Sequence, residues 1–401
     1  MSRLAWATLL GACATTAAVA LGSRPLGVAG VGILLAALVG RAWAGAVRGP
    51  ATLTVSITPQ PASEGDRIRI EIEARRSSRV PVGGATVRGR LGGSRAIECP
   101  LAGHGRTLVG IEDLGRLPRG RYPLEETRLE LVDHLGLSTQ TVAVPVRAAI
   151  LVRPRLVELR ALPGDVGRRE LDGRRLLLRR PVGFDLHSVR EYEQGESLRR
   201  VHWPTTARRG RLMVKDLQDA PRDAVVVLLD CDPAGAVGEP PHSSFDTAVR
   251  AAGSLVRAIA LRGRRAVLVT TASDARALTV RGLGGDFSAA LDVLAAVRPD
   301  ARAGLAAALR RGETAASEAA ELVVVTAVLS GATVDAILRS ARRSSVSVVW
   351  IDAASFAGRP ATTSPGALRL ARGGITTAVV RAGDDLAAAL APGPVREAAR
   401  A

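Results

Sequence analysis

Charged and aromatic side chains that could bind an anion or move a proton gather between residues 183 and 217. Guanidinium groups bind carboxylates and phosphates in a bidentate manner and lie flat on aromatic rings. One interpretation is an ion-paired clasp that fastens this segment to the following domain, with Trp203 as its apolar anchor. The other is a recognition surface for a partner protein or an anion. We favour the clasp because the opposite charges can satisfy one another. The residues concerned are Arg190, Glu191, Tyr192, Glu193, Gly195, Glu196, Arg199, Arg200, His202, Trp203, Ala207 and Arg208.

His202 is the only group of this segment that titrates near neutral pH in its unperturbed form. It stands beside Trp203, with no Ser or Cys nucleophile paired to it in the sequence. We therefore interpret His202 as a structural residue and not as an acid–base catalyst.

A second candidate site follows the apolar run 224–229 (AVVVLL), which ends at Asp230-Cys231-Asp232. Ligands of open parallel sheets gather at the carboxyl ends of the strands, so these carboxylates are well placed for binding. Mg²⁺ requires octahedral oxygen ligands, and two carboxylates without hydroxyl donors are an incomplete set. We expect Asp230 to accept hydrogen bonds at the strand end, and Asp246 to cap a helix. A magnesium site at Asp230 and Asp232 stays open as the alternative.

The elements expected around this site alternate between strands and helices over residues 218–395. Such alternation predicts an α/β doubly wound sheet, with the run 224–229 as a central parallel strand buried on both faces. Strands are expected at 224–229, 265–270, 322–328, 346–351 and, as an edge strand, 376–380, and helices at 245–262, 287–297, 332–342 and 384–390.

Residues 51–160 show a different pattern, with short runs of alternating apolar and polar residues between Gly- and Pro-containing turns. This spacing predicts an all-β sandwich domain. The expected strands cover 52–58, 67–74, 85–91, 128–132 and 139–146. A Gly- and Arg-rich linker, 161–182, separates this domain from the 183–217 segment.

The first 48 residues contain two apolar runs that predict a transmembrane helical hairpin, with helices at about 4–21 and 26–47 and a turn at residues 22–25. A signal peptide cleaved after Ala18-Val19-Ala20 is the alternative, but the second apolar run follows at once. Trp6 and Trp43 would mark one interface. Three arginines flank the two ends of the hairpin and only Arg24 lies in the turn, so the positive-inside rule places the bulk of the chain in the cytoplasm.

The net charge of +17 suggests nucleic-acid binding at first sight. The arginines, however, are interleaved with acidic residues over the whole length, and aromatic residues make up 2% of the chain, too few for a base-stacking platform. We therefore expect no nucleic-acid partner. The three cysteines show neither a disulfide nor a zinc pattern.

Two resemblances follow from these motifs. Asp230 and Asp232 after an apolar strand resemble the start of the metal-dependent adhesion site of von Willebrand factor type A domains, although Ala234 replaces a serine and no Asp follows Thr326. The 183–217 segment resembles the family known as domain of unknown function 58. That resemblance rests on Arg190-Glu191-Tyr192, Gly195-Glu196, Arg199, Trp203 and Ala207-Arg208. His202 and Pro204 depart from the family pattern.

The resemblance implies a bacterial membrane protein with two transmembrane passes and a von Willebrand factor A-like domain. Members of the family are commonly associated with MoxR-type AAA ATPases and other membrane complex subunits. We therefore expect a non-catalytic interaction or adaptor protein, with the lipid bilayer and an ATPase as partners and no cofactor, except Mg²⁺ in the alternative. The sequence contains no phosphate-binding loop, no nucleophile elbow and no paired Cys/His ligands, so no enzyme activity is expected.

Overall fold

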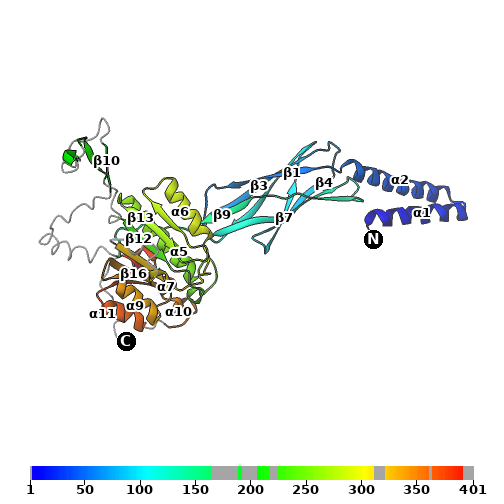
Figure 1. The fold of residues 1–401 in the computed structure, drawn as a ribbon. Coiled ribbons are helices and arrows are strands. Elements are labelled where there is room, and N and C mark those ends of the chain that lie inside the picture. Colours follow the sequence, from blue (N-terminus) through cyan, green and yellow to red (C-terminus); the bar gives the residue numbers. More distant parts are fainter. Residues whose placement is uncertain are drawn as a thin grey trace. The chain divides into compact units, whose positions relative to one another are not determined.

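The structure, a computed structural model, describes residues 2–163, 188–191, 206–208, 210–216, 224–310, 321–360 and 364–391. The chain divides into two compact units, Met1–Arg155 and Leu156–Ala401. Each unit is described by itself (Figure 1).

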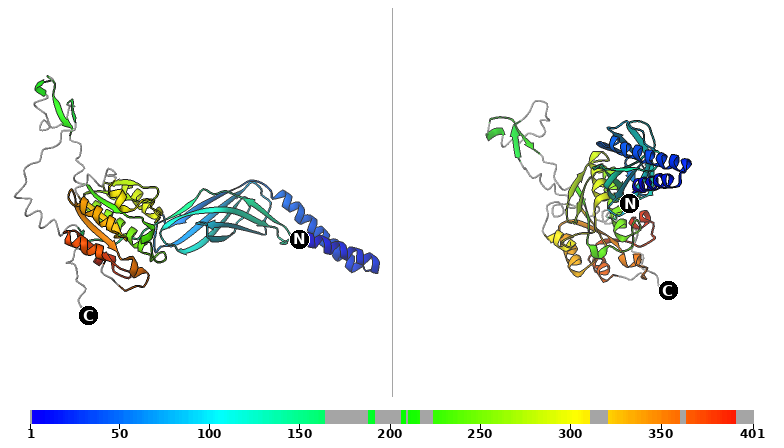
Figure 2. Two further views of the ribbon diagram at one scale, coloured as in Figure 1. Left: turned by 60° about the horizontal axis from the view of Figure 1, so that its bottom comes forward. Right: turned by 90° about the vertical axis from the view of Figure 1, so that its right-hand side faces the viewer.

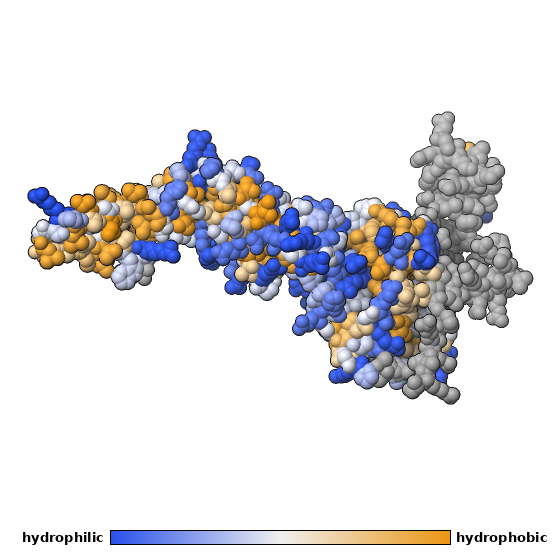
Figure 3. All heavy atoms as spheres, turned by 180° about the vertical axis from the view of Figure 1, so that it is seen from behind, coloured by the Kyte–Doolittle hydropathy of each residue, from blue (hydrophilic) through white to orange (hydrophobic). Residues whose placement is uncertain are grey.

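The first unit begins with two helices, α1 (Arg3–Leu21) and α2 (Arg24–Ala46), which lie against each other as a hairpin (Figure 2). Both are long and apolar enough to cross a membrane. Gly22 at φ 63° and Ser23 make the turn, so Arg24 and Pro25 belong to the first turn of α2 and not to the expected longer loop. The outer surface of the hairpin is apolar (Figure 3), with Val19 82% and Leu21 75% exposed.

Close packing of the hairpin depends on small residues. A Cβ on Gly30 would lie 2.6 Å from Oγ1 of Thr15, and one on Gly11 would lie 2.9 Å from Cγ of Leu34. Gly11 and Gly30 are both buried, and small residues at such positions let the backbones of two apolar helices approach closely.

Helix α2 is joined directly to the β-domain of the same unit. The indole Nε1 of Trp43 donates to the carbonyl of Pro81 (2.8 Å), and the hydroxyl of Ser78 donates to the carbonyl of Ala46 (3.0 Å). Val47, 3% exposed, belongs to the core of the β-domain. These contacts fix the end of the hairpin on the domain that follows.

The β-domain contains two sheets. The smaller has the order β1-β3-β6, and the larger the order β2-β9-β7-β4-β5, with β8 also paired to β7. Buried side chains from both sheets, such as Ile70 of β3 and Leu129 of β7, share one core. Its description as a β-sandwich stays our interpretation. The strands are β1 (Ala51–Thr58), β2 (Ala62–Ser63), β3 (Arg67–Arg76), β4 (Gly84–Leu91), β5 (Arg95–Leu101), β6 (Thr107–Arg116), β7 (Gly120–Val132), β8 (Thr139–Ala143) and β9 (Ala149–Arg153).

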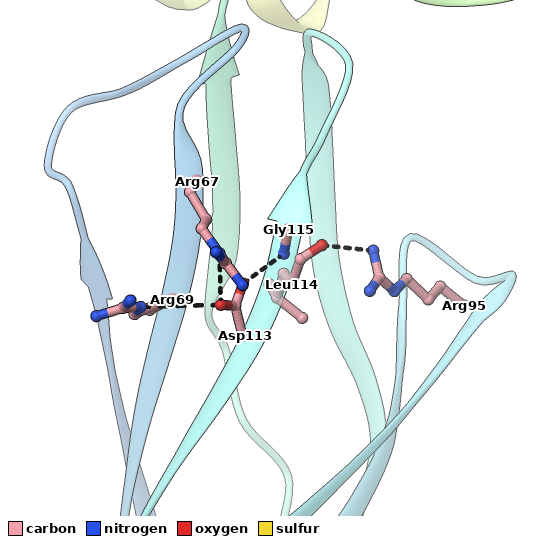
Figure 4. Close-up of polar contacts among 6 residues, drawn as sticks. All are labelled: Arg67, Arg69, Arg95, Asp113, Leu114 and Gly115. Atoms are coloured by element: carbon pink, nitrogen blue, oxygen red, sulfur yellow. Dashed lines mark hydrogen bonds and ion pairs between the residues drawn. The ribbon is translucent and has the colours of Figure 1, made fainter.

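The irregularity between β3 and β6 is held by Asp113 (Figure 4). Its carboxylate accepts hydrogen bonds from Arg67 Nε (2.7 Å) and from the N–H of Gly115 (2.8 Å), and Arg69 Nε lies 3.9 Å away. Gly115 has φ 68°, a conformation that favours glycine. The Gly115 hydrogen bond and the two arginines lower the pKa of the Asp113 carboxyl.

The second unit contains a six-stranded sheet of order β14-β13-β12-β15-β16-β17. All neighbours are parallel except the edge pair β13–β14. The parallel strands thus follow the 2-1-3-4-5 order of an open doubly wound sheet. The strands are β12 (Ala224–Leu229), β13 (Arg265–Thr270), β14 (Ala277–Val280), β15 (Glu321–Thr326), β16 (Ser345–Ile351) and β17 (Thr376–Val380).

Helices cover both faces of this sheet (Figure 1). Alternate residues of β12 enter different cores: Val225 packs with α5 residues such as Leu255, whereas Val226 packs with α9 residues such as Ile337. Every residue of β12 is buried, as the apolar run predicts. The helices are α5 (Ser244–Leu261), α6 (Gly285–Ala296), α7 (Leu305–Arg310), α9 (Gly331–Ser340), α10 (Ala353–Phe356), α11 (Pro365–Arg372) and α12 (Leu386–Leu390).

Within the second unit, the described residues of the 183–217 segment form an antiparallel pair, β10 (Ser188–Glu191) with β11 (Met213–Asp216). A helical turn at Thr206–Arg208 precedes Gly210, which has φ 64° and donates to the carbonyl of Thr206 (2.9 Å). Gly210 thus follows this helical turn in the left-handed conformation that glycine favours. Most of the linker 161–182 lies outside the described residues.

The expected strands of the second unit are found at or within two residues of their predicted positions. The antiparallel edge strand β14, the helices α7, α10 and α11, and the β-domain strands β2, β5, β6 and β9 were not predicted. Strand β7 runs from Gly120 to Val132 and is much longer than the expected 128–132, because its two halves pair with different neighbours, β9 and β8.

Candidate functional site

Polar side chains meet at the carboxyl ends of the three central strands of the second unit. Asp230 follows β12, Thr271 follows β13, and Thr326 ends β15. Because β12 lies between β13 and β15 in a parallel arrangement, these three residues come together although 96 positions separate Asp230 from Thr326. This edge is where doubly wound sheets bind their ligands.

The Asp230 carboxylate is 6% exposed and is bound on both oxygens. Oδ2 accepts a hydrogen bond from the Thr326 hydroxyl (2.7 Å). Oδ1 lies 3.3 Å from both the Thr271 hydroxyl and the N–H of Asp232. The expected role of Asp230 as an acceptor at the strand end is thus observed, but two threonine hydroxyls contribute beside the single loop amide.

Burial shifts the pKa values of two side chains at this edge. Burial raises the pKa of Asp230, the charge of Asp232 adds to the rise, and the hydrogen bonds from Thr326, Asp232 and Thr271 oppose it. Burial and the Asp230 charge together raise the pKa of the neighbouring Cys231 thiol to about 12. A thiol with so high a pKa is a poor nucleophile at neutral pH.

The side chains of this edge that could bind magnesium also hold the local backbone. Asp232 uses Oδ1 to accept from the N–H of Ala234 (2.9 Å) and so caps a short 3₁₀ turn, Pro233–Gly235. Ala234 has no hydroxyl to offer. Among the described residues, no three His, Cys, Asp or Glu side chains are grouped so that they could hold a metal ion. Both oxygens of Asp230 accept hydrogen bonds from the protein.

Asp246, the other carboxylate considered from the sequence, stabilises the start of α5. The Ser243 hydroxyl donates to Oδ2 of Asp246 (2.6 Å), and the N–H of Asp246 donates back to Oγ of Ser243 (3.0 Å). This reciprocal pair is a capping arrangement that also places a negative charge at the helix N-terminus.

Asp352 is a buried carboxylate that the sequence analysis missed. It follows β16 at the same edge of the sheet, is 2% exposed, and its Oδ2 lies 3.6 Å from Nε of Arg381. The Asp352 N–H donates to the carbonyl of Val380 (2.9 Å), which continues the pairing of β16 with β17. Its position directly after an apolar strand repeats that of Asp230, and this repeat is the signal that could have revealed it.

The structure describes only part of the 183–217 segment. Tyr192, Gly195, Glu196, Arg199, His202 and Trp203 lie outside the described residues. Arg190 and Glu191 lie in β10, opposite Val214 and Met213 of β11. Ala207 and Arg208 are exposed on the helical turn. The Thr206 hydroxyl accepts from the N–H of Met213 (3.0 Å), which fixes this turn against β11.

Comparison with known families adds one result. Residues 188–355 match the family described as protein of unknown function DUF58. This match covers the β10–β11 segment and the α/β sheet through β16, and it supports the family resemblance drawn from the 183–217 motif. No curated protein matches the chain.

Similarity to solved structures is limited. An uncharacterized protein from Listeria monocytogenes is 12% identical over 27% of this chain and 10% of its own, with a TM-score of 0.19. An alkylpurine DNA glycosylase from Pseudomonas fluorescens is 14% identical over 31% of this chain and 39% of its own, with a TM-score of 0.15. Cwp6 from Clostridium difficile is 8% identical over 74% of this chain and 37% of its own, with a TM-score of 0.21. In each case this chain spans well under two thirds of the other protein.

Proposed function

We propose that this protein is a membrane-anchored, non-catalytic adaptor that docks a MoxR-type AAA ATPase or assembles a membrane complex. In this proposal α1 and α2 cross a bacterial cell membrane as a two-pass hairpin, and the bulk of the chain lies in the cytoplasm. The second unit, a von Willebrand factor A-like domain in this interpretation, supplies the binding surfaces.

The observation that carries the proposal is the continuity between hairpin and β-domain. Gly11 and Gly30 let α1 pack closely on α2, and Trp43 and Ser78 fasten the end of α2 to the β-domain. A cleaved leader would not need such packing against the helix that follows it. An apolar hairpin that packs against a folded domain favours a permanent membrane anchor. The β-domain and the α/β domain of such an anchored chain could both bind partners, as an adaptor requires.

The carboxyl edge of the α/β sheet supports a binding role in preference to catalysis. The Asp230 oxygens are engaged by Thr326, Thr271 and the Asp232 backbone, and the Cys231 thiol is held protonated. The polar groups at this edge are thus used to hold the strand ends together, which favours a binding role.

Co-purification tests the adaptor proposal. The tagged full chain would be extracted from its own membranes in mild detergent with and without ATP, and retained proteins identified by mass spectrometry. We expect a hexameric AAA ATPase to be retained by this chain and not by an unrelated two-pass membrane protein with the same tag. Equal recovery with both baits, or no ATPase with either, would refute the docking of an ATPase.

Cysteine labelling tests the orientation. Ser23→Cys places a thiol in the exposed turn between the helices, while Cys99 and Cys231 are buried and Cys13 lies within α1. We expect a membrane-impermeant maleimide to label Ser23→Cys in intact cells and Ser77→Cys, in the β-domain, only after lysis. Labelling in the reverse order would place the bulk of the chain outside the cytoplasm.

Metal-dependent binding at Asp230 and Asp232 is the second proposal. The observation in its favour is that the partly exposed Asp232 lies next to the buried Asp230, and two adjacent negative charges attract a cation. Calorimetric titration of the full chain with Mg²⁺ and with Mn²⁺ decides the matter. Saturable heat that Asp232→Asn abolishes would support the site, and its absence would exclude it.

A further inference from the structure

An arginine-rich pocket lies at the edge of the α/β sheet opposite to Asp230. Helix α9 starts after the carboxyl end of β15 and ends just before β16 begins at Ser345, so its last turn reaches the amino edge of the sheet. The pocket there has a volume of about 340 Å³, within the ~300–1,000 Å³ range of ligand sites. It is lined by Leu309, Arg310, Ala336, Arg339, Ser340, Arg342, Arg343 and Ser344.

The described residues that line this pocket carry only positive charge. They include four arginines and no acidic residue. The single carboxylate of α9, Asp335, is already paired with Arg369 (2.7 Å). Within the described part of the chain, none of the four pocket arginines takes part in an ion pair, whereas Arg264, Arg276 and Arg381 of the same unit all do.

The local backbone compensates for only a small part of this charge. The C-terminus of a helix carries about half a negative elementary charge. Its carbonyls are moreover in use, because the N–H groups of Arg342, Arg343 and Ser344 donate to the carbonyls of Arg339 and Ser340. Among the described residues, four guanidinium groups thus face one cavity without a carboxylate to pair with them, and such a cluster attracts an anionic group.

We propose that this arginine pocket (Arg310, Arg339, Arg342 and Arg343) docks an acidic segment of a partner protein. Guanidinium forks bind the carboxylates of Asp and Glu side chains in a bidentate manner. Nucleic acid fits less well, because the lining residues that the structure describes include no aromatic side chain on which a base could stack. The inference rests on the proposed adaptor function and assigns that function a surface on the side of the sheet away from Asp230.

Peptide binding to the full chain tests the proposal. The probe is a fluorescently labelled octaglutamate, measured by anisotropy against the protein in nanodiscs of zwitterionic lipid, with octaglutamine as the uncharged control. The variant R342E/R343E reverses two pocket charges. The matched control R281E/R302E makes the same change at two exposed arginines outside the pocket. We expect at least a tenfold weaker affinity for R342E/R343E and less than a twofold change for R281E/R302E.

Several results would overturn the proposal. These are equal weakening by both variants, no octaglutamate binding by the wild type, or tighter binding of a single-stranded oligonucleotide with the same dependence on Arg342 and Arg343. If R342E/R343E fails to fold, as judged by circular dichroism, R339Q/R342Q provides the same comparison with smaller changes.

If R342E/R343E still co-purifies with the ATPase, the arginine pocket is not the docking site, and the proposed adaptor function is unaffected. If the wild type retains no ATPase but binds octaglutamate through the pocket, the docking of an ATPase is refuted, whereas the binding of acidic segments by the pocket is supported.

Discussion

The Thr326 hydroxyl lies 2.7 Å from Oδ2 of Asp230 and joins the carboxyl ends of two adjacent parallel strands. The same hydroxyl oxygen accepts from the N–H of Val328 (3.0 Å), so the turn after β15 is held at the same point. A threonine side chain of the neighbouring strand thus binds one oxygen of the buried carboxylate directly.

We therefore expect Thr326→Val to destabilise the protein by about 1.5–3 kcal/mol, the range for a hydrogen bond to a charged group. The substitution keeps the shape of the side chain and leaves the buried Asp230 carboxylate with one donor fewer. The midpoint of urea unfolding in detergent measures the loss. Thr279→Val, an exposed change on β14, serves as the control and should shift the free energy by about 0.5 kcal/mol or less. Equal losses in the two variants would show that the hydroxyl of Thr326 contributes nothing.

Asp230→Asn tests the pH dependence of this edge. Because the pKa of Asp230 is raised by burial, the folded state binds the proton more tightly than the unfolded state. The contribution of Asp230 is thus most favourable below the unfolded pKa of about 3.9, and it is lost as the pH rises towards the folded pKa. An asparagine side chain at this position can accept hydrogen bonds from Asp232 and Thr271 and donate one to Thr326, so the variant protein should keep its fold.

We expect the stability of Asp230→Asn, relative to the wild type, to increase as the pH rises from about 3.5 and then to level off above the folded pKa of Asp230. Urea unfolding at a series of pH values measures this difference. Asp274→Asn, at an exposed site in the same unit, provides the control profile. A difference that stays constant with pH would show that burial does not perturb Asp230.

The parallel sheet of the second unit was predictable because its strands are short, continuous apolar runs. Such runs are typical of strands buried on both faces. Strand β14 escaped prediction because its pattern is that of an exposed edge: Ala277 and Thr279 face solvent and only Val280 is buried. In the β-domain, β5 contains Pro100 and β6 contains two glycines, residues that argue against strands when they are read singly.

The sequence predicted the aspartates of the candidate site but not its threonines. Asp230 and Asp232 could be placed at the carboxyl edge because they follow β12 directly. The roles of Thr271 and Thr326 depend on which strands are neighbours, and strand order is not encoded in local periodicity. The arginine pocket likewise combines α7 with α9, and these two helices meet only through packing on a shared face of the sheet.

The buried ion pair between Arg264 and Glu321 gives a third prediction. Nη2 of Arg264 lies 2.8 Å from Oε2 of Glu321 at the amino end of β15, and the two side chains are 22% and 6% exposed. Arg264→Met keeps the aliphatic stem but removes the charge that compensates a buried carboxylate. We expect a loss of about 3 kcal/mol, at the low end for buried pairs because Arg264 is partly exposed. Arg276→Met breaks an exposed pair with Asp274 and should cost about 1 kcal/mol or less. Comparable losses by thermal unfolding would show that the Arg264 pair is no stronger than a surface pair.

The packing of the hairpin gives the last prediction. A Cβ on Gly30 would lie 2.6 Å from Oγ1 and 2.8 Å from the backbone N of Thr15, whereas a Cβ on Gly32, two residues along the same helix, would meet nothing within 4 Å. Backbone atoms of α1 cannot yield as a flexible side chain could, so Gly30→Ala must push the helices apart and should cost about 1–3 kcal/mol. The added methyl group of Gly32→Ala would meet no neighbouring atom, so this change should alter the stability little. The midpoint of SDS-induced unfolding in mixed micelles measures both variants. Because the two substitutions add the same methyl group at neighbouring positions, identical midpoints would mean that α1 and α2 do not pack through Gly30, and the argument for a permanent anchor would lose its main support.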